Sequence, residues 1–430
     1  MNSNKNISIS DLILALMSIG IPFTIKLGNI SLIIGFLYTL YLLIISKGKL
    51  FKEGMSFKFV FPMGFFLIVL ASTFYSKDVA SGLKQVEKNM LFPLIVLTLI
   101  VINSTKQINI RSTLKVFSLS TLVCTLILVF IGITRIFNGE GIEVLFFHEL
   151  GSFFDLHPVY MAINLCITTL FITDEYLIRE DYRSKKRFII VLVLAFSIFA
   201  LFLCASKAVI FCFAMLYCVQ LYRVFRSLTY RAAMFTSILL ISFVVVKTPK
   251  LADRFLQGLH FDISEFSPTN KVEEAVVFDN YEKSNVSDLE LRYLMFKMGT
   301  FHVIDDSKLI FGYGIGDVQN HIDYYYMLYG LAPGWFEGYN LHNQYLQYLV
   351  TYGIFVFLFF CAYIYYSARL AILNKNQLHL FFLILISIIF LFECLLSRNK
   401  GIVIFIFLNT LFLILYKNEN SYNRHKGHTQ

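Results

Sequence analysis

A histidine flanked by two asparagines is the first feature of this 430-residue chain that could do chemistry. His342 lies near the start of the stretch NLHNQYLQYLVTYG, between Asn340 and Asn343. A polar segment ends there and an apolar one begins. Imidazole titrates near neutral pH, so His342 could act as a general base. Either asparagine could orient its ring. An alternative interpretation is that His342 only caps a helix.

Four cations also lie at the edges of apolar stretches. Lys207 interrupts LFLCASKAVIFCFAML, Arg292 lies within LELRYLMFKMGTFHVI, and Arg398 and Lys400 belong to the short turn SRNKG. Charges at a membrane boundary are costly unless they are solvated or used, and such cations can stabilise a negative charge that develops in a reaction. Lys207 could instead be a lysine that extends to the membrane surface, Arg292 a solvated surface charge, and the last two plain turn residues.

Composition indicates a membrane protein. Hydrophobic residues make up 57% of the chain and charged residues 15%, whereas soluble domains have about 45–50% and about 25%. The net charge of +9 is explained by basic loops on one side of a membrane, so nucleic-acid binding is not expected. All seven cysteines lie in apolar stretches, and no H-E-x-x-H spacing or P-loop occurs. We therefore expect no disulfide framework, metal or cofactor.

Apolar stretches predict an all-α, polytopic protein with about twelve membrane helices, because one span needs about 20 apolar residues. The predicted spans are 11–26, 30–46, 57–75, 90–103, 114–134, 158–173, 187–204, 207–222, 232–247, 342–366, 378–396 and 402–416.

Basic residues predict the orientation. Lysines and arginines gather in alternate loops, which places those loops and both termini in the cytoplasm. The one large polar segment, 248–340, then lies outside between the ninth and tenth spans, together with all the residues singled out above. We predict three regions: N-terminal helices over 1–187, a catalytic region over 188–416 and a cytoplasmic tail over 417–430. The basic segment 76–90 is predicted to be amphipathic.

The polar segment contains two local patterns. Ser287 and Glu290 form a capping box before a predicted helix. The segment FGYGIGD, from Phe311 to Asp317, lacks the spacing and the strand context of a dinucleotide fingerprint. It predicts a tight turn that packs the segment.

At these residues the chain resembles the O-antigen ligase and O-antigen polymerase family of bacterial membrane glycosyltransferases. The resemblance is carried by LCASKAVIF, by LELRYLMFKMGTFHVIDDSKLIFGYGIGD and by NLHNQYLQYLVTYGIFVF, in this order, and by the closing ECLLSRNKGIVIFIFLNTLF. It is best from about Phe188 to the last helix. The family commonly has arginine where this chain has Lys207, and lysine keeps the charge but loses the planar fork that fits phosphate.

The resemblance implies metal-independent transfer of a polyprenyl-diphosphate-linked glycan on the periplasmic face of the inner membrane. The acceptor is lipid A core in ligases and another lipid-linked repeat unit in polymerases. In this interpretation His342 is the base, while Arg292, Lys207, Arg398 and Lys400 stabilise the diphosphate.

Two other functions remain open at this stage. A transporter or flippase of lipid-linked sugars would also have about twelve spans, although the predicted mid-span regions carry almost no charge. A sensor or structural protein would use the large loop to bind a partner. Ligase and polymerase share the donor chemistry, so the sequence does not separate them.

Overall fold

The computed structural model describes residues 8–179, 184–224, 261 and 277–416. Every regular element in these residues is a helix, which confirms the all-α prediction. The predicted span 232–247, nearly all of segment 248–276 and the tail 417–430 lie outside the described residues.

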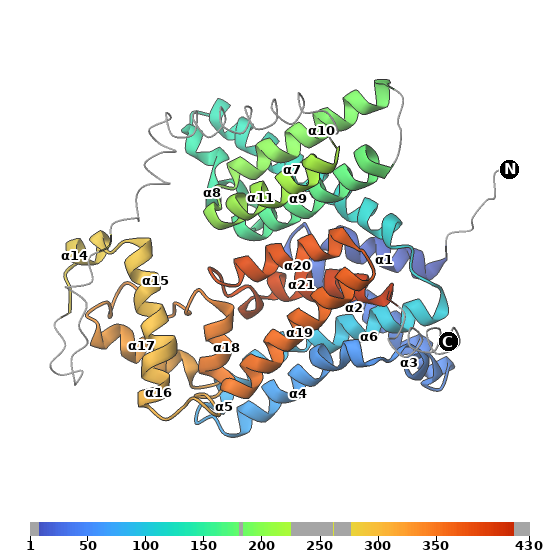
Figure 1. Cartoon of the computed structure of the whole chain (residues 1–430). Coiled ribbons are helices and arrows are strands. Elements are labelled where there is room, and N and C mark those ends of the chain that lie inside the picture. Colours follow the sequence, from blue (N-terminus) through green and yellow to red (C-terminus); the bar gives the residue numbers. More distant parts are fainter. Residues whose placement is uncertain (1–7, 180–183, 225–260, 262–276, 417–430) are drawn as a thin grey trace.

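The helices that precede the large polar segment form two groups in Figure 1, one containing α1 to α6 and the other containing α7 to α11. They are α1 (Ile9–Gly20), α2 (Ile25–Ile45), α3 (Lys49–Gly54), α4 (Val60–Phe74), α5 (Val79–Asn89), α6 (Leu91–Thr105), α7 (Ile110–Phe137), α8 (Phe147–Gly151), α9 (Pro158–Thr173), α10 (Ser184–Leu203) and α11 (Lys207–Val224).

The rest of the described chain forms a loop unit beside the bundle and then returns to it (Figure 1). The loop unit comprises α14 to α17 and packs on α18 around a hydrophobic core of its own. These helices are α14 (Asn280–Asn285), α15 (Asp288–Lys297), α16 (Val303–Asp305), α17 (Val318–Leu328), α18 (Gln344–Tyr352), α19 (Ile354–Leu373), α20 (Gln377–Ile389) and α21 (Asn399–Ile414).

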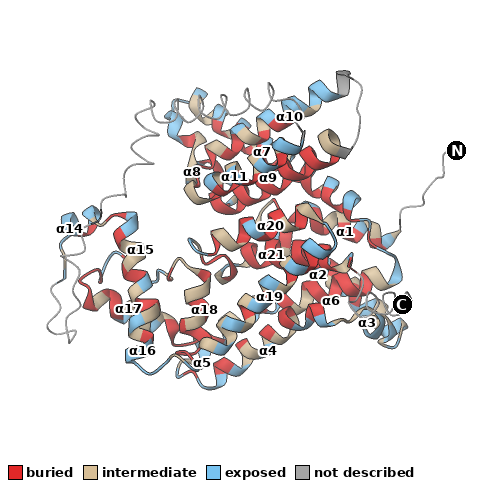
Figure 2. Ribbon diagram, viewed as in Figure 1, coloured by how far each residue is buried: buried red, intermediate tan, exposed pale blue. Residues whose placement is uncertain are grey.

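Among the described residues, six helical segments are long and apolar enough to cross a membrane, and four shorter helices are apolar. The six are Ile25–Ile45, Phe57–Phe74, Val79–Thr105, Ile110–Phe137, Pro158–Ile178 and Ile354–Leu373. Large apolar side chains on the outer helices are exposed, as Leu67 and Phe130 illustrate. Figure 2 shows exposed residues on the outer faces and buried residues between the helices, as expected for a protein in lipid. The count of about twelve spans stays a prediction.

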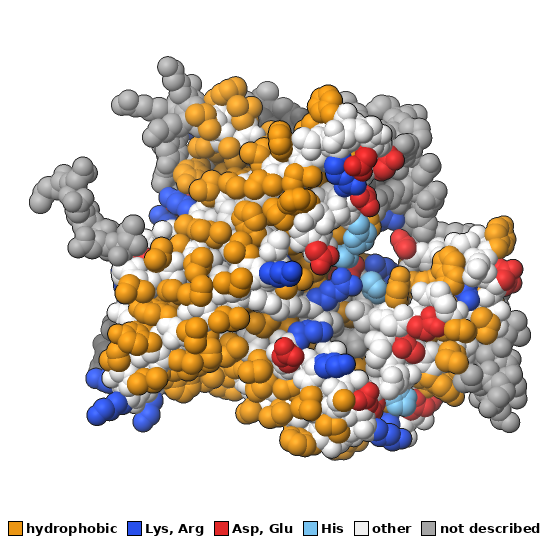
Figure 3. All heavy atoms as spheres, turned by 180° about the vertical axis from the view of Figure 1, so that it is seen from behind, with side chains coloured by type: hydrophobic (Ala, Val, Ile, Leu, Met, Phe, Trp, Pro, Cys, Tyr) orange, Lys and Arg blue, Asp and Glu red, His pale blue; other side chains and the backbone are white. Residues whose placement is uncertain are grey.

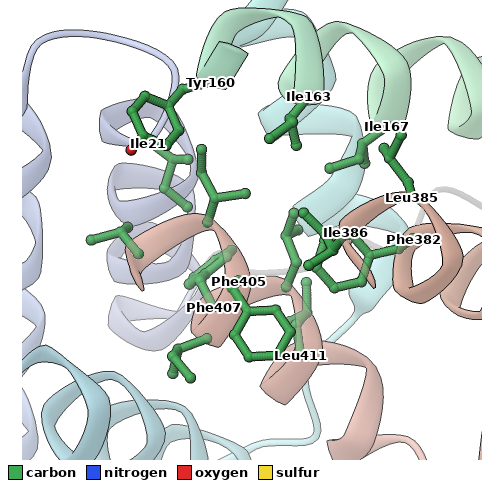
Figure 4. Packing of buried hydrophobic residues seen from close by; sticks show 14 of the residues in the cluster. Ile21, Tyr160, Ile163, Ile167, Phe382, Leu385, Ile386, Phe405, Phe407 and Leu411 are labelled. Carbon is green, nitrogen blue, oxygen red and sulfur yellow. The ribbon is translucent and has the colours of Figure 1, made fainter. Parts of the chain in front are cut away.

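The bundle interior is apolar and centred on α9, which is buried along its whole length. Figure 4 shows Ile163 and Ile167 of α9 pointing toward α20, where Leu385 and Ile386 lie. Small residues bring other helices together: a Cβ on Gly20 would lie 2.4 Å from Oγ of a serine on α2. Close packing of this kind holds helices together in lipid, where the hydrophobic effect gives no net attraction between them.

Three predicted spans are wrong in their bounds. The predicted span 11–26 crosses the connection between α1 and α2. The predicted span 342–366 is broken into α18 and α19 at Gly353, whose φ is +84°. The N–H of Ile354 then bonds outside the helix, to the Leu309 carbonyl at 2.8 Å. The predicted span 378–396 ends as α20 at Ile389. His342 and the segment after Ile389 therefore lie outside the spanning helices.

The glycine-rich segment attaches the loop unit to the bundle, which confirms the predicted packing turn. The Asp317 carboxylate accepts hydrogen bonds from the backbone N–H groups of Lys77 at 2.7 Å and Asp78 at 2.9 Å. Gly316 lies so close to the same connection that a Cβ there would be 2.1 Å from the Asp78 carbonyl oxygen. The loop unit is thus held against the α4–α5 connection. The predicted capping box is also present, since Ser287 and Glu290 begin α15.

Candidate functional site

His342 precedes α18 in an unusual backbone conformation. Its φ is +43°, a left-handed value that is unfavourable for a residue with a Cβ. Asn340 supports this conformation by accepting the His342 N–H through Oδ1 at 3.0 Å. Asn343 caps α18, since its Oδ1 accepts the N–H groups of Tyr345 and Leu346. The two asparagines thus fix the backbone around His342, and neither is bonded to the imidazole ring.

A carboxylate lies beside the imidazole. His342 Nδ1 is 3.3 Å from Glu393 Oε2, and both side chains are partly exposed. Glu393 belongs to the turn between α20 and α21, which is tied to the start of α18 through Gln344. The Gln344 N–H donates to the Phe390 carbonyl, and its Oε1 accepts the Leu396 N–H, both at 2.7 Å. These two hydrogen bonds of Gln344, on either side of Glu393, therefore fix the carboxylate next to the histidine.

The Glu393 carboxyl is ionised in this site. Burial raises its pKa, but contact with His342 and the positive charge of Arg292 outweigh burial, so the pKa is below its ordinary value. The carboxylate at Nδ1 leaves Nε2 as the ring nitrogen that can face a substrate.

Arg292 connects α15 to the same turn. Its Nη1 donates to the Phe392 carbonyl at 2.7 Å, and its guanidinium lies 5.6 Å from the centroid of the Phe392 ring. Phe392 directly precedes Glu393, so the structure brings Arg292 to the His342–Glu393 pair. The guanidinium has five N–H donors, and the Phe392 carbonyl accepts from only one nitrogen.

Lys207 lies beside α15, the helix that carries Arg292. It is the first residue of α11, and its Nζ lies 3.6 Å from Oδ2 of Asp288. Asp288 stands four residues before Arg292, and residues at this spacing share one face of a helix. Lys207 is thereby placed at the face of α15 that carries Arg292. The ion pair is solvent-exposed and contributes about 0–1 kcal/mol.

Arg398 and a neighbouring lysine provide two further cations. Within the described part of the chain, the Arg398 guanidinium makes no hydrogen bond or ion pair. Lys88 of α5 donates to the Ser397 carbonyl at 2.9 Å, and its charge and that of Arg398 repel each other. Two neighbouring cations, neither of them paired with a described carboxylate, favour binding of an anion.

Lys400 does not join the cluster that His342, Glu393, Arg292 and Arg398 form. Its side chain is buried, and its Nζ donates to the carbonyl of Ile21 at 2.7 Å and to that of Phe23. These carbonyls belong to the connection between α1 and α2. The ammonium therefore fastens α21 to that connection.

His157 faces the cluster from α9. Its Nδ1 accepts the Val159 N–H at 3.4 Å and so caps the helix, and its ring lies 4.8 Å from that of His148. Burial lowers the pKa of His157 to about 4, and the positive charge of Arg398 acts in the same direction. The charges of Glu393 and His342 also act on it. His157 is therefore neutral at physiological pH, with Nε2 as its N–H donor.

Sequence reasoning missed Glu393, Lys88 and His157 as members of this site. Glu393 was counted within an apolar span, and Lys88 within an amphipathic segment without a role. His157 and His148 were not singled out. A usable signal was present for His157, because a histidine before Pro158 begins a span on the outer side.

The arrangement offers a base beside several cations. Figure 3 shows basic side chains and histidines gathered in the middle of one face, at the border of a broad hydrophobic surface. Among the described residues, no group of three or more His, Cys, Asp or Glu side chains could hold a metal ion. Proton removal by imidazole and charge stabilisation by guanidinium and ammonium groups are the chemistry that these side chains can supply.

Comparison with known proteins finds a family model for part of the chain. No curated protein matches the chain. Residues 191–361 match the family model described as O-antigen ligase, a segment that contains Lys207, Arg292 and His342. The match confirms the resemblance seen in the sequence and points to membrane glycosyl transfer in polysaccharide biosynthesis. The chain is thus a membrane protein whose residues 191–361 match the family model described as O-antigen ligase.

Proposed function

We propose that this protein transfers a glycan from a polyprenyl diphosphate to a hydroxyl group of an acceptor glycan, on the periplasmic face of a bacterial inner membrane. The observation that carries the proposal is the His342–Glu393 pair, which lies beside Arg292 and near Arg398. A base and cations that stabilise a diphosphate are the two requirements of this reaction.

In the proposed reaction, Nε2 of His342 accepts the proton of the acceptor hydroxyl while the oxygen attacks the anomeric carbon of the donor. A new C–O bond forms, and the bond between the anomeric carbon and the diphosphate oxygen breaks. The electron pair leaves with the polyprenyl diphosphate. Glu393 stabilises the imidazolium, which then releases its proton to solvent or to the departing phosphate.

The leaving diphosphate is stabilised by Arg292, Arg398 and Lys88 in this proposal. Lys207 helps to hold α15 and adds positive charge at its face. Lys400 has no such role, because its ammonium is already bound to backbone carbonyls. The catalytic region corresponds to residues 188–416, with His157 contributed by the preceding helices. Both termini are proposed to be cytoplasmic, as the basic loops predict.

The direct test is His342→Ala in a strain that lacks the chromosomal copy. We expect a loss of glycan transfer of about 10²–10⁴-fold, with unchanged protein in the membrane fraction. Arg292→Lys should also lose activity, because lysine lacks the planar fork, whereas the exposed Lys308→Ala serves as the control. Full-length surface polysaccharide in the His342→Ala strain would show that the base assignment is wrong.

The acceptor can be identified in a deletion strain. Lipid A core that carries a single repeat unit would indicate a polymerase. Bare core together with accumulated lipid-linked polymer would indicate a ligase. Normal polysaccharide in that strain would contradict the proposed reaction itself.

A further inference from the structure

A row of aromatic rings leads from the outer edge of the loop unit to His342. The ring of Trp335 lies 6.2 Å from that of Phe336, which lies 5.6 Å from Tyr339. The Tyr339 ring in turn lies 6.0 Å from the imidazole of His342. Phe336 is buried, whereas Trp335 is 40% exposed and Tyr339 is 44% exposed. Two open aromatic faces are thus arranged along one path to the proposed base.

The backbone that carries these rings is held in place. The Gly338 N–H donates to Asp323 Oδ1 at 2.9 Å, and Gln319 Nε2 donates to the Tyr339 carbonyl at 3.1 Å. The Glu337 carboxylate accepts the Gly334 N–H. The exposed rings are therefore fixed before a ligand arrives, which reduces the entropy lost on binding.

The indole N–H of Trp335 already has a hydrogen-bond partner. Its Nε1 donates to Asn280 Oδ1 at 3.0 Å, so the part of the ring that remains available is its face. The Tyr339 hydroxyl has no hydrogen-bond partner among the described residues. One ring thus offers an apolar face, and the other offers a face together with a free hydroxyl group.

We infer that Trp335 and Tyr339 form a platform on which pyranose rings of the glycan stack, and that it guides the glycan to His342. The inference rests on the proposed function and names the sugar-binding part of that site. Sugar rings have faces of C–H groups that pack against the negatively charged face of an aromatic ring, while their hydroxyl groups seek polar partners such as Tyr339. Trp and Tyr supply such rigid contact area at low entropic cost.

A membrane-interface role for Trp335 is less compatible with its surroundings. It is bonded to α14, which Figure 1 shows on the side of the loop unit away from the bundle. That helix begins with the acidic capping box of Asp279 and Glu282, and Lys283 of the same helix donates to the Pro333 carbonyl at 2.9 Å. Such a charged neighbourhood favours water and carbohydrate over lipid tails.

The test uses Trp335 as its own reporter, because it is the single tryptophan of the chain. The full-length protein in detergent is titrated with oligosaccharide repeats that mild acid releases from the surface polysaccharide of the source strain. We expect a saturable change in tryptophan fluorescence, and about tenfold weaker binding for Tyr339→Ala. Inorganic pyrophosphate should leave the fluorescence unchanged, because it lacks sugar rings.

Two further measurements separate this inference from the proposed function. His342→Ala should keep the fluorescence response while it loses transfer. If transfer depends on His342 but the oligosaccharide gives no response, the platform is refuted and the reaction stands. In vesicles that contain lipids brominated on their tails, Trp335 should keep its emission. Strong quenching there would place Trp335 in the membrane and would also overturn the inference.

Discussion

Nδ1 of His342 lies 3.3 Å from Oε2 of Glu393, although the first residue precedes α18 and the second follows α20. The contact depends on the left-handed conformation of His342 and on the bonds of Gln344 to the turn that carries Glu393. Left-handed residues with a Cβ cost about 1–2 kcal/mol, and such strain is concentrated at functional sites. The pair orients the imidazole so that Nε2 is left for a substrate.

Removing the charge of Glu393 should slow transfer without unfolding the protein. Glu393→Gln keeps the shape of the side chain but no longer stabilises an imidazolium, so we expect kcat to fall at least about tenfold. Transfer is measured with membranes and lipid-linked donor. Glu393→Asp keeps the charge and should recover part of the loss. Equal rates for the glutamine variant and the unmodified protein would remove Glu393 from the mechanism.

Arg398 and Lys400 should behave differently although one residue separates them. Arg398→Ala removes a cation that has no partner among the described residues, so transfer should fall while the melting temperature is unchanged. Lys400→Met leaves the carbonyls of Ile21 and Phe23 without their donor, which costs about 1–3 kcal/mol of stability. Its melting temperature should fall, and activity per folded molecule should not. The reverse pattern would assign the diphosphate role to Lys400.

His157 should make the protein less stable in mild acid. Its pKa is about 4 in the folded state and about 6.5 when unfolded, so the unfolded chain binds more protons between these values. Stability contributed by neutral His157 is therefore present above pH 6.5 and is progressively lost as the pH falls toward 4. The melting temperature of His157→Asn should decrease less over this range, since asparagine can still cap α9 but does not titrate. Parallel curves for both proteins would contradict the assignment.

Gly353 should be essential for the break between α18 and α19. Its φ is +84°, and a Cβ there would lie 1.9 Å from the Ile310 carbonyl oxygen, so Gly353→Ala should lower the melting temperature and loosen the loop unit. Gly64→Ala is the matched control, because Gly64 lies inside α4 with no neighbouring atom within 4 Å of its added Cβ. It should leave the melting temperature unchanged or raise it slightly. Limited proteolysis of the loop unit provides a second measurement.

Features that depend on local sequence could be predicted. Apolar runs located most of the helices, because burial in lipid requires long apolar stretches. The capping box of Ser287 and Glu290 was predicted correctly because it depends on residues close in the chain. The glycine-rich segment was recognised as a packing turn, although the sequence did not show that its partners are Lys77 and Asp78. His342 and Arg292 were recognised as candidates because a charged or titratable group at an apolar boundary is unusual.

Only the tertiary structure decided which of these residues meet. Arg398 and Lys400 have similar positions in the sequence, yet the charge of Arg398 acts on His157, whereas Lys400 bonds to the α1–α2 connection. The predicted span 378–396 included Glu393, because an apolar run does not show where its helix ends. That end is set by the bond between the Gln344 N–H and the Phe390 carbonyl, a contact between distant parts of the chain. The sequence by itself determined a membrane helix bundle with a histidine and several cations at its edges, and long-range packing determined which of them form one site.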